Sequence, residues 1–322
     1  MQNIFTVNKE SQGRRLDAFL VKKLPDLSRS KIQKMIAADL VSVNGKQPTK
    51  HQFLKEKDEI EIRNKKSEIG ELEKQQQKKA KAGVRKGDFS LWEKIKIIDD
   101  TPDYLIIEKP SGLLVHPTEK HETNTLIDWA SEKYPEIAKI GDEPGRAGIV
   151  HRLDKEVSGL MVLPRTQDAF EHFKVLFKTR QIEKKYLAMV YGEVKSDTGE
   201  INFTLSRGKI RAGLFIASPE ASGVGKPAKT LYWVKTRFKN YTLLEVEILT
   251  GRTHQIRVHL KALGHPVVGD ELYKSRRLKE KAKINRIFLH AASLSFVDLR
   301  GRRQKYQSDL PEELKEFLKK IK

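Results

Sequence analysis

The stretch from residue 65 to residue 90 most restricts how this chain can fold. It begins KKSEIGELEKQQQKKAKAGVRKGDF, is rich in Lys, Glu and Gln, and has almost no apolar side chain to bury. A segment of this composition cannot contribute to a hydrophobic core, so we expect a mobile tether or a transient solvated helix. The sequence therefore predicts two folded domains, residues 1–64 and residues 91–322, joined by a flexible charged linker at 65–90.

The charge of the chain indicates what it binds. Its 322 residues include 63 Lys and Arg against 43 Asp and Glu, a net charge of +20. Such an excess favours a polyanionic partner through long-range attraction and counterion release. A membrane partner is not expected, because no run approaches the roughly 18 apolar residues of a spanning helix, and the N-terminus has no apolar signal core. The absence of cysteine excludes disulfides and thiolate metal sites and fits a reducing compartment. We expect a cytoplasmic protein that binds nucleic acid.

Residues 1–64 have the pattern of a small α+β domain. One helix is predicted after Gly13, ending near Pro25, and a second is predicted to be capped by Ser28 or Ser30. Their apolar side chains fall at helical spacing: Leu16, Phe19, Leu20, Ile32, Met35 and Ile36. A strand at 40–43, an Asn-Gly turn at 44–45 and an alternating strand at 60–62 complete a small sheet.

Three basic side chains, Arg29, Lys31 and Lys34, project from the other side of the second helix and suit contact with a phosphate backbone. The order LSRSKIQKMI…LVSVNGK…DEIEI resembles the S-four-type RNA-binding domain, over about residues 13–63. The alternative is a small interaction domain whose basic face is incidental. The resemblance implies that these three residues contact RNA.

Residues 91–322 combine many strands with few helices. Strands are expected at 92–98, 104–107, 149–150, 160–163, 186–191, 231–238, 241–248, 288–296 and 303–307. Helices are expected from near Thr125, at 167–179, from Thr250 or Thr253 to Gly264, and at 312–320, while 206–229 reads as a long loop or hairpin. A regular βαβ repeat is missing. The fold class predicted is α+β, with a mixed, mainly antiparallel sheet flanked by helices.

The segment GIVHRLDKEVSGLMVLPR, residues 148–165, places a charged loop between two apolar runs. We expect the two runs to form short strands that support the loop, because sites tend to be built where rigid strand ends hold loops. Asp154 is the only carboxylate in the first half of the loop. A carboxylate among basic groups stays ionised and only accepts hydrogen bonds, so it can act as nucleophile or base but not as acid. A solvated surface turn is the alternative interpretation.

Other kinds of site are not indicated. The sequence contains no phosphate-binding G-x-x-x-x-G-K-[ST] motif and no H-E-x-x-H zinc motif. His254 and His259 lie five residues apart, about 140° around a helix, and so do not face one another. Asp154 has no evident second carboxylate for glycosidase chemistry. Neither a metal nor a cofactor is predicted.

Four segments in order resemble the motifs of RluA-type pseudouridine synthases. They read EKPSGLLVHPT, GIVHRLDKEVSGLMVLPRT, EKKYLAMVYG and LLEVEILTGRTHQIRVHLKALGHPVVGD, within about residues 92–305. The resemblance implies an isomerase that converts uridine to pseudouridine in structured RNA. The RNA implied is that of the large ribosomal subunit, including RNA in pre-ribosomal particles. A transfer-RNA substrate and a catalytically silent ribosome-assembly factor are the alternatives, and a monomer is expected.

The resemblance also implies roles for individual residues. Asp154 is the catalytic aspartate, acting at the ribose anomeric carbon, at C6 of the base, or by abstracting a proton. Arg152 enters the RNA and fills the space left by the flipped base. Tyr186 stacks on that base, and Arg257 pairs with Asp154 and orients it. Val157 departs from the family, which often has threonine there, and so does the Pro-Arg pair at 164–165, where Ala-Lys is common.

Overall fold

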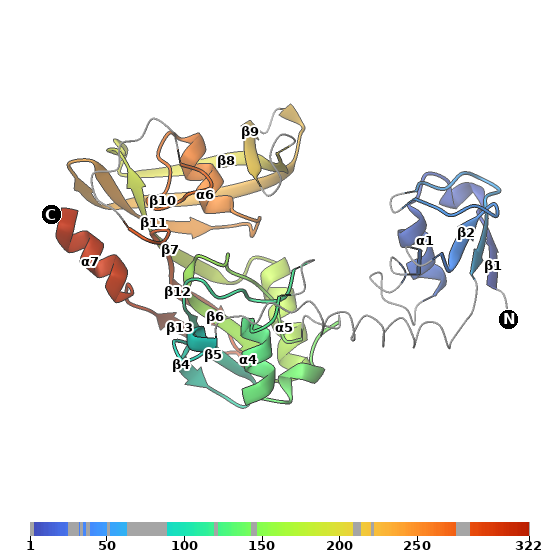
Figure 1. Ribbon diagram of the computed structural model, residues 1–322, viewed down its shortest axis with the longest axis horizontal. Coiled ribbons are helices and arrows are strands. Elements are labelled where there is room, and N and C mark those ends of the chain that lie inside the picture. The colour runs from blue at the N-terminus through green and yellow to red at the C-terminus, as the bar shows by residue number, and fades with distance from the viewer. Residues whose placement is uncertain are drawn as a thin grey trace. The chain divides into compact units, whose positions relative to one another are not determined.

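The computed structural model describes residues 3–24, 32, 35–36, 39–49, 52–62, 89–118, 122–142, 147–208, 214–219, 222–274 and 284–321. Its backbone forms two compact units that divide near residue 85 (Figure 1). The predicted RNA-binding residues Arg29, Lys31 and Lys34 lie outside the described residues, as does nearly all of the predicted linker. The predicted domain boundaries therefore stay predictions.

The first unit is a three-stranded antiparallel sheet with a helix. It contains β1 (Asn3–Thr6), a 3-10 helix (Lys9–Ser11), α1 (Leu16–Lys23), β2 (Val41–Val43) and β3 (Glu59–Ile62), with the strand order β1-β3-β2. All six apolar side chains that were predicted to face inward are buried. The predicted turn is confirmed by the positive φ angles of Asn44 (51°) and Gly45 (72°). Strand β1 was not predicted, because four residues at a sheet edge give too little pattern.

The second unit contains a ten-stranded sheet (Figure 1). The strand order is β4-β5-β6-β12-β7-β11-β10-β8-β9, with β13 beside β12. Among the described strands β6 and β12 form the one parallel pair, which confirms the predicted mixed, mainly antiparallel sheet. The strands are β4 (Lys96–Asp100), β5 (Tyr104–Lys109), β6 (Ser158–Pro164), β7 (Glu183–Tyr191), β8 (Thr198–Arg207), β9 (Phe215–Pro219), β10 (Lys226–Phe238), β11 (Tyr241–Ile248), β12 (Leu289–Val297) and β13 (Arg303–Gln307).

Helices cover both faces of this sheet. Along β5, Leu105 and Ile107 share a core with α4, whereas Tyr104 and Ile106 share the opposite core with α5. Helix α6 lies on the same face as α4, and α7 packs with the other face. Because both faces are covered, β6 is buried at all seven positions. The helices are α4 (Leu126–Lys133), α5 (Gln167–Lys178), α6 (Gln255–Ala262) and α7 (Glu312–Ile321), with 3-10 turns at Phe89–Leu91 and Ile137–Lys139.

Three local predictions were wrong. The first strand begins at Lys96, because Trp92 lies in a turn and donates its indole N–H to a loop carbonyl. Residues 149–150 form no strand, because Ile149 and Val150 pack into separate cores before the chain enters β6. Helix α6 is capped at His254 and not at a threonine. The 206–229 segment includes strand β9, which forms a hairpin with β8.

Within the described residues, no helix is long and apolar enough to cross a membrane.

Candidate active site

A cavity of about 690 Å³ gathers the predicted site residues of the second unit. Arg152, Asp154, Tyr186 and Arg257 all line it, although they come from three segments far apart in the chain. The cavity lies on the sheet face that carries α4 and α6, beside the middle strands. Its volume is within the range of small-molecule sites and is ample for one nucleotide.

The loop that carries Asp154 is held by the segment after β5, and not by a strand on each side. The amide of Gly112 donates to the carbonyl of Lys155 at 2.8 Å, and the hydroxyl of Ser111 donates to the carbonyl of Glu156 at 2.6 Å. The buried ammonium of Lys109 donates to the same Lys155 carbonyl at 3.1 Å and to two further carbonyls. Burial, with the charge of Arg286 adding to it, lowers the pKa of Lys109 to about 7. Lys109 therefore joins two loops and does not face the cavity.

The end of the same loop enters β6 at a point that requires glycine. Gly159 has φ 123° and lies in register with Ala291 of the parallel strand β12. A Cβ at this position would overlap the backbone of Ala291. The close approach of the two strands is possible only without a side chain there, and it fixes where the loop leaves the sheet.

His151 anchors the start of the loop. Its ring stacks on Phe177 of α5, with the centroids 4.6 Å apart, and its Nε2 accepts a hydrogen bond from the amide of Val162 at 3.1 Å. Burial, with the charge of Lys184 adding to it, lowers the pKa of His151 to about 3. The imidazole is therefore neutral and acts as a fixed acceptor, which leaves it unsuited to carry protons in a reaction near pH 7.

Arg257 lies between two carboxylates. Its Nη1 donates to Oδ2 of Asp154 at 3.2 Å, while Nε and Nη2 form a bidentate pair with Asp270 at 2.7 and 2.8 Å. Burial alone would lower the pKa of Arg257, but hydrogen bonds and charge from Asp270, followed by Asp154, raise it. The side chain of Asp270 is fully buried and also accepts the amides of Leu272 and Tyr273. Arg257 is thus a fixed cation that Asp270 aims at Asp154.

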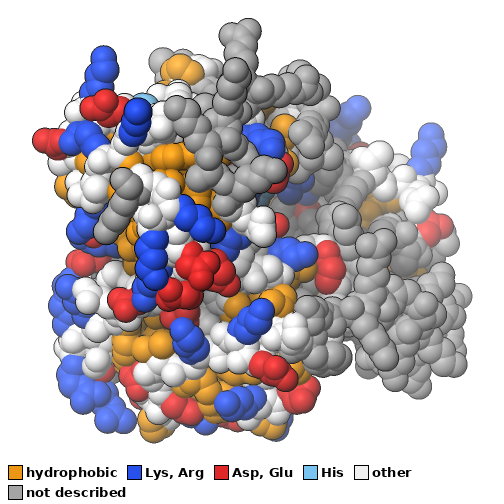
Figure 2. Space-filling view, turned by 60° about the vertical axis from the view of Figure 1, so that its left-hand side comes forward, with side chains coloured by type: hydrophobic (Ala, Val, Ile, Leu, Met, Phe, Trp, Pro, Cys, Tyr) orange, Lys and Arg blue, Asp and Glu red, His pale blue; other side chains and the backbone are white. Residues whose placement is uncertain are grey.

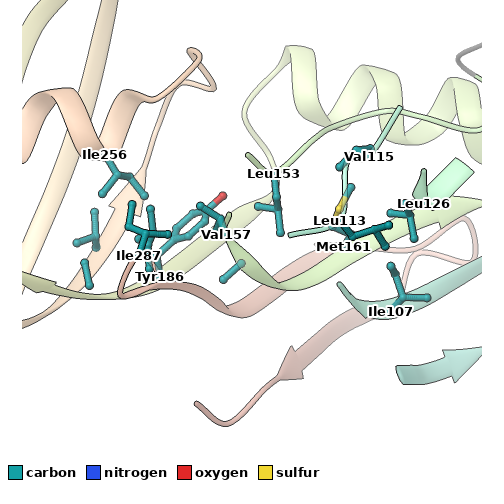
Figure 3. Packing of buried hydrophobic residues seen from close by; sticks show 14 of the residues in the cluster. Ile107, Leu113, Val115, Leu126, Leu153, Val157, Met161, Tyr186, Ile256 and Ile287 are labelled. Atoms are coloured by element: carbon teal, nitrogen blue, oxygen red, sulfur yellow. The ribbon is translucent and has the colours of Figure 1, made fainter. Parts of the chain in front are cut away.

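Tyr186 reaches the cavity from β7. It is 5% exposed and lies beside Val157, Ile256 and Ile287 (Figure 3). Burial, with the charge of Asp154 adding to it, raises the pKa of Tyr186, so the phenol stays protonated. A neutral aromatic ring at the wall of a cavity can pack against a base.

Arg152 is exposed at the rim of the cavity. Its Nη1 lies 3.3 Å from Nε2 of His116, and Nδ1 of that histidine lies 2.8 Å from the carbonyl of Pro117. Since a carbonyl can only accept, Nδ1 carries the proton and Nε2 accepts from Arg152. Among the described residues no carboxylate pairs with Arg152. Within the described part of the chain its charge is therefore not neutralised by an acidic side chain.

Sequence reasoning missed three residues of the cavity region. Asp270 is the last residue of the apolar run VVGD, and a carboxylate in that place was a signal for a buried ion pair. Lys184 lines the cavity on the same strand face as Tyr186 and has no carboxylate partner in the described part of the chain. His254 was considered only as a metal ligand, yet its Nε2 lies 3.9 Å from Oδ2 of Asp154.

Comparison with known proteins agrees with this geometry. Residues 103–262 match the RNA pseudouridylate synthase family, and residues 14–60 match the S4 domain family. An uncharacterized RNA pseudouridine synthase of Aquifex aeolicus is 38% identical over 267 residues, which are 82% of this chain and 78% of that protein. Ribosomal large subunit pseudouridine synthase D of Yersinia pestis is 33% identical over 328 residues, 98% of this chain and 94% of that protein.

Solved structures show the same relationship. Human RNA Pseudouridylate Synthase Domain Containing 1 superposes with a TM-score of 0.57 and 25% identity, covering 70% of this chain and 86% of that one. The chain belongs to the RNA pseudouridine synthase family. It is an isomerase that converts uridine to pseudouridine in RNA, with an S4 domain near its N-terminus.

Proposed function

We propose that this enzyme isomerises specific uridines in large-subunit ribosomal RNA, with Asp154 as its catalytic group. The observation that carries the proposal is the convergence of Asp154, Arg257 and Tyr186 in one cavity. Arg257 holds the carboxylate of Asp154 by a hydrogen bond of 3.2 Å, and a carboxylate is the group required for attack at the anomeric carbon, for attack at C6 and for proton abstraction alike.

The reaction fits a site built from side chains alone. The bond between N1 and the anomeric carbon breaks, and a bond between C5 and the same carbon forms, while C5 loses a proton and N1 gains one. Atoms and electrons balance within the substrate, so no cofactor is needed. Arg257 orients the carboxylate, and the ring of Tyr186 stacks on the flipped base while it is detached.

Access to the base requires that it leave the RNA stack, which costs a few kcal/mol. Arg152 offsets part of this cost by entering the RNA at the rim and replacing the lost stacking and phosphate contacts. Lys184, whose pKa burial lowers to about 8, supplies a second cation along the cavity wall. The S4 domain adds further contacts, with Arg29, Lys31 and Lys34 against phosphates.

The choice of large-subunit ribosomal RNA is supported by the names of relatives that match nearly the whole chain and by the additional RNA-binding domain. All residues proposed for catalysis come from one chain, so a monomer is sufficient. We place the enzyme in the cytoplasm, in line with the bacterial relatives named as ribosomal large subunit pseudouridine synthases.

Mapping of pseudouridines in cells with and without the gene tests this assignment. We expect one or a few positions in large-subunit ribosomal RNA to lose pseudouridine, and to regain it when the wild-type gene is restored. Transfer RNA from the same cells serves as the comparison. A loss confined to transfer RNA would contradict the ribosomal substrate, and no loss in any RNA would contradict the function.

A further inference from the structure

The N-terminal end of α6 places a histidine beside the catalytic carboxylate. His254 has a left-handed backbone (φ 56°), its side chain is 18% exposed, and it lines the same cavity as Asp154. Its Nε2 lies 3.9 Å from Oδ2 of Asp154, the oxygen that Arg257 contacts at 3.2 Å. The side chain makes no capping hydrogen bond to α6, so helix capping does not account for it.

The other ring nitrogen of His254, Nδ1, is hydrogen-bonded to the hydroxyl of Tyr273. The amide of Phe215 donates to the hydroxyl of Tyr273 at 2.9 Å, and this hydroxyl lies 2.8 Å from Nδ1 of His254. Among the described residues Nδ1 is the one acceptor within hydrogen-bond distance of the hydroxyl. Tyr273 therefore donates to Nδ1, and the neutral ring carries its own proton on Nε2, the nitrogen nearer to Asp154.

The surroundings of Tyr273 keep this arrangement in place. The guanidinium of Arg257 lies over the tyrosine ring at 5.1 Å, and the ring is 1% exposed. The rings of Phe215 and Tyr273 both meet the imidazole edge to face, with centroids 5.8 and 5.5 Å away. Two aromatic contacts and the hydrogen bond at Nδ1 thus hold the orientation of the imidazole in the free enzyme.

We propose that His254 is a positioning residue that donates from Nε2 to Oδ2 of Asp154 when RNA is bound. Arg257 and His254 then hold one carboxylate oxygen, and Oδ1 is left to react with the substrate. Hydrogen bonds of this kind are often long in a free enzyme and shorten in the complex, which fits the gap of 3.9 Å. The inference rests on the proposed role of Asp154.

The charges that face His254 come from several elements. Asp154 and Glu156 belong to the loop before β6, Arg257 belongs to α6, and Asp270 follows that helix. Burial lowers the pKa of His254, Arg257 lowers it further, and the three carboxylates oppose the change. The ring is neutral above its ordinary pKa of about 6.5. It can therefore supply one fixed donor without changing its charge during the reaction.

Two substitutions distinguish the contribution of the imidazole side chain from that of the left-handed backbone at residue 254. Asn tolerates a left-handed backbone better than most residues, so His254→Asn keeps the turn but cannot reach Asp154. His254→Gln places an amide N–H near the position of Nε2. With large-subunit ribosomal RNA tritiated at C5 of uridine, we expect His254→Asn to lower the single-turnover rate roughly tenfold to hundredfold, the range of one charge-assisted hydrogen bond. RNA affinity should be unchanged, and His254→Gln should recover most of the rate.

Nitrogen NMR of histidine tests the tautomer without any activity measurement. We expect the proton of His254 on Nε2 in the wild-type protein, and a mixture of both tautomers in Tyr273→Phe. The ratio of the wild-type rate to the His254→Asn rate should stay constant between pH 7 and pH 9, because the ring does not titrate there, whereas Lys109 and Lys184, whose pKa values burial lowers to about 7 and about 8, affect both proteins alike.

Three results would overturn the inference. They are a His254→Asn rate equal to wild type, equal losses in His254→Asn and His254→Gln, and a proton found on Nδ1. A wild-type protein that converts no uridine in ribosomal or transfer RNA would instead contradict the proposed function. The NMR result would still decide the tautomer on which the positioning role depends.

Discussion

At the scale of the residue, the site depends on one arginine shared by two carboxylates. Asp270 takes two of the guanidinium N–H groups and Asp154 takes a third. The fork of arginine makes this possible, because lysine has no planar arrangement of donors that could hold two carboxylates in fixed directions. Asp270 also neutralises the buried cation, so Asp154 is free to react without leaving an unpaired charge.

We therefore expect Asp270→Asn to damage both stability and catalysis. Removing one partner of a buried ion pair typically costs roughly 3–5 kcal/mol, and Arg257 would then turn more fully toward Asp154. Chemical denaturation should show the loss in free energy of unfolding, and single-turnover assays below the melting temperature should show a slower reaction. The neighbouring Glu271, which is exposed, gives the control Glu271→Gln. Equal stability of the two variants would contradict the role given to Asp270.

At the scale of the element, the sequence predicted what local patterns encode. The helix after Thr125 begins with a capping box formed by Thr125 and Asp128, and β10 and β11 meet at residues 239–240, between the strands predicted at 231–238 and 241–248. The irregular lead-in at 149–150 could not be predicted. Ile149 and Val150 have the apolar pattern of a strand. The loop that follows them is held instead by Lys109, which donates to the carbonyl of Lys155, 46 residues later in the chain.

The same limit applies to the site. Asp154, Arg257 and Tyr186 were predicted from their motifs, and the structure brings them together in the cavity. Asp270 and His254 lie within the quoted motifs, but the role of each depends on a contact with another residue. The role of Asp270 depends on its contact with Arg257, and that of His254 depends on a tyrosine 19 residues later. Spacing in the sequence does not reveal such pairs.

At the scale of the whole molecule, the net charge of +20 is spread widely. Figure 2 shows Lys and Arg side chains distributed among acidic and apolar ones on the face in view, without one continuous basic stripe. The cations on the face in view therefore do not mark one binding surface, and a particular set of residues must provide the phosphate contacts.

The S4 domain should provide part of that set. We expect a triple substitution of Arg29, Lys31 and Lys34 by Gln to reduce the slope of log affinity against log salt by about two to three units, because each phosphate contact contributes about 0.7–0.9. Removal of residues 1–64 should also make the slope shallower. Filter binding with ribosomal RNA at several salt concentrations measures it.

A matched control changes three lysines of the C-terminal region, Lys315, Lys319 and Lys320, to Gln. This variant loses the same charge, so it isolates the effect of position from that of net charge. If the S4 triple variant and the control have the same slope as the wild-type protein, the S4 domain makes no phosphate contacts and its assigned role is wrong.

The central claim is that Asp154 performs the chemistry, and the most direct test compares purified wild-type protein with Asp154→Asn on large-subunit ribosomal RNA. The substitution preserves shape and removes the ionised oxygen. We predict equal RNA affinity, within about twofold, and no detectable release of tritium from C5 of uridine, a loss of at least the roughly hundredfold expected for one catalytic group. Conversion by Asp154→Asn at a rate near that of the wild-type protein would contradict the account.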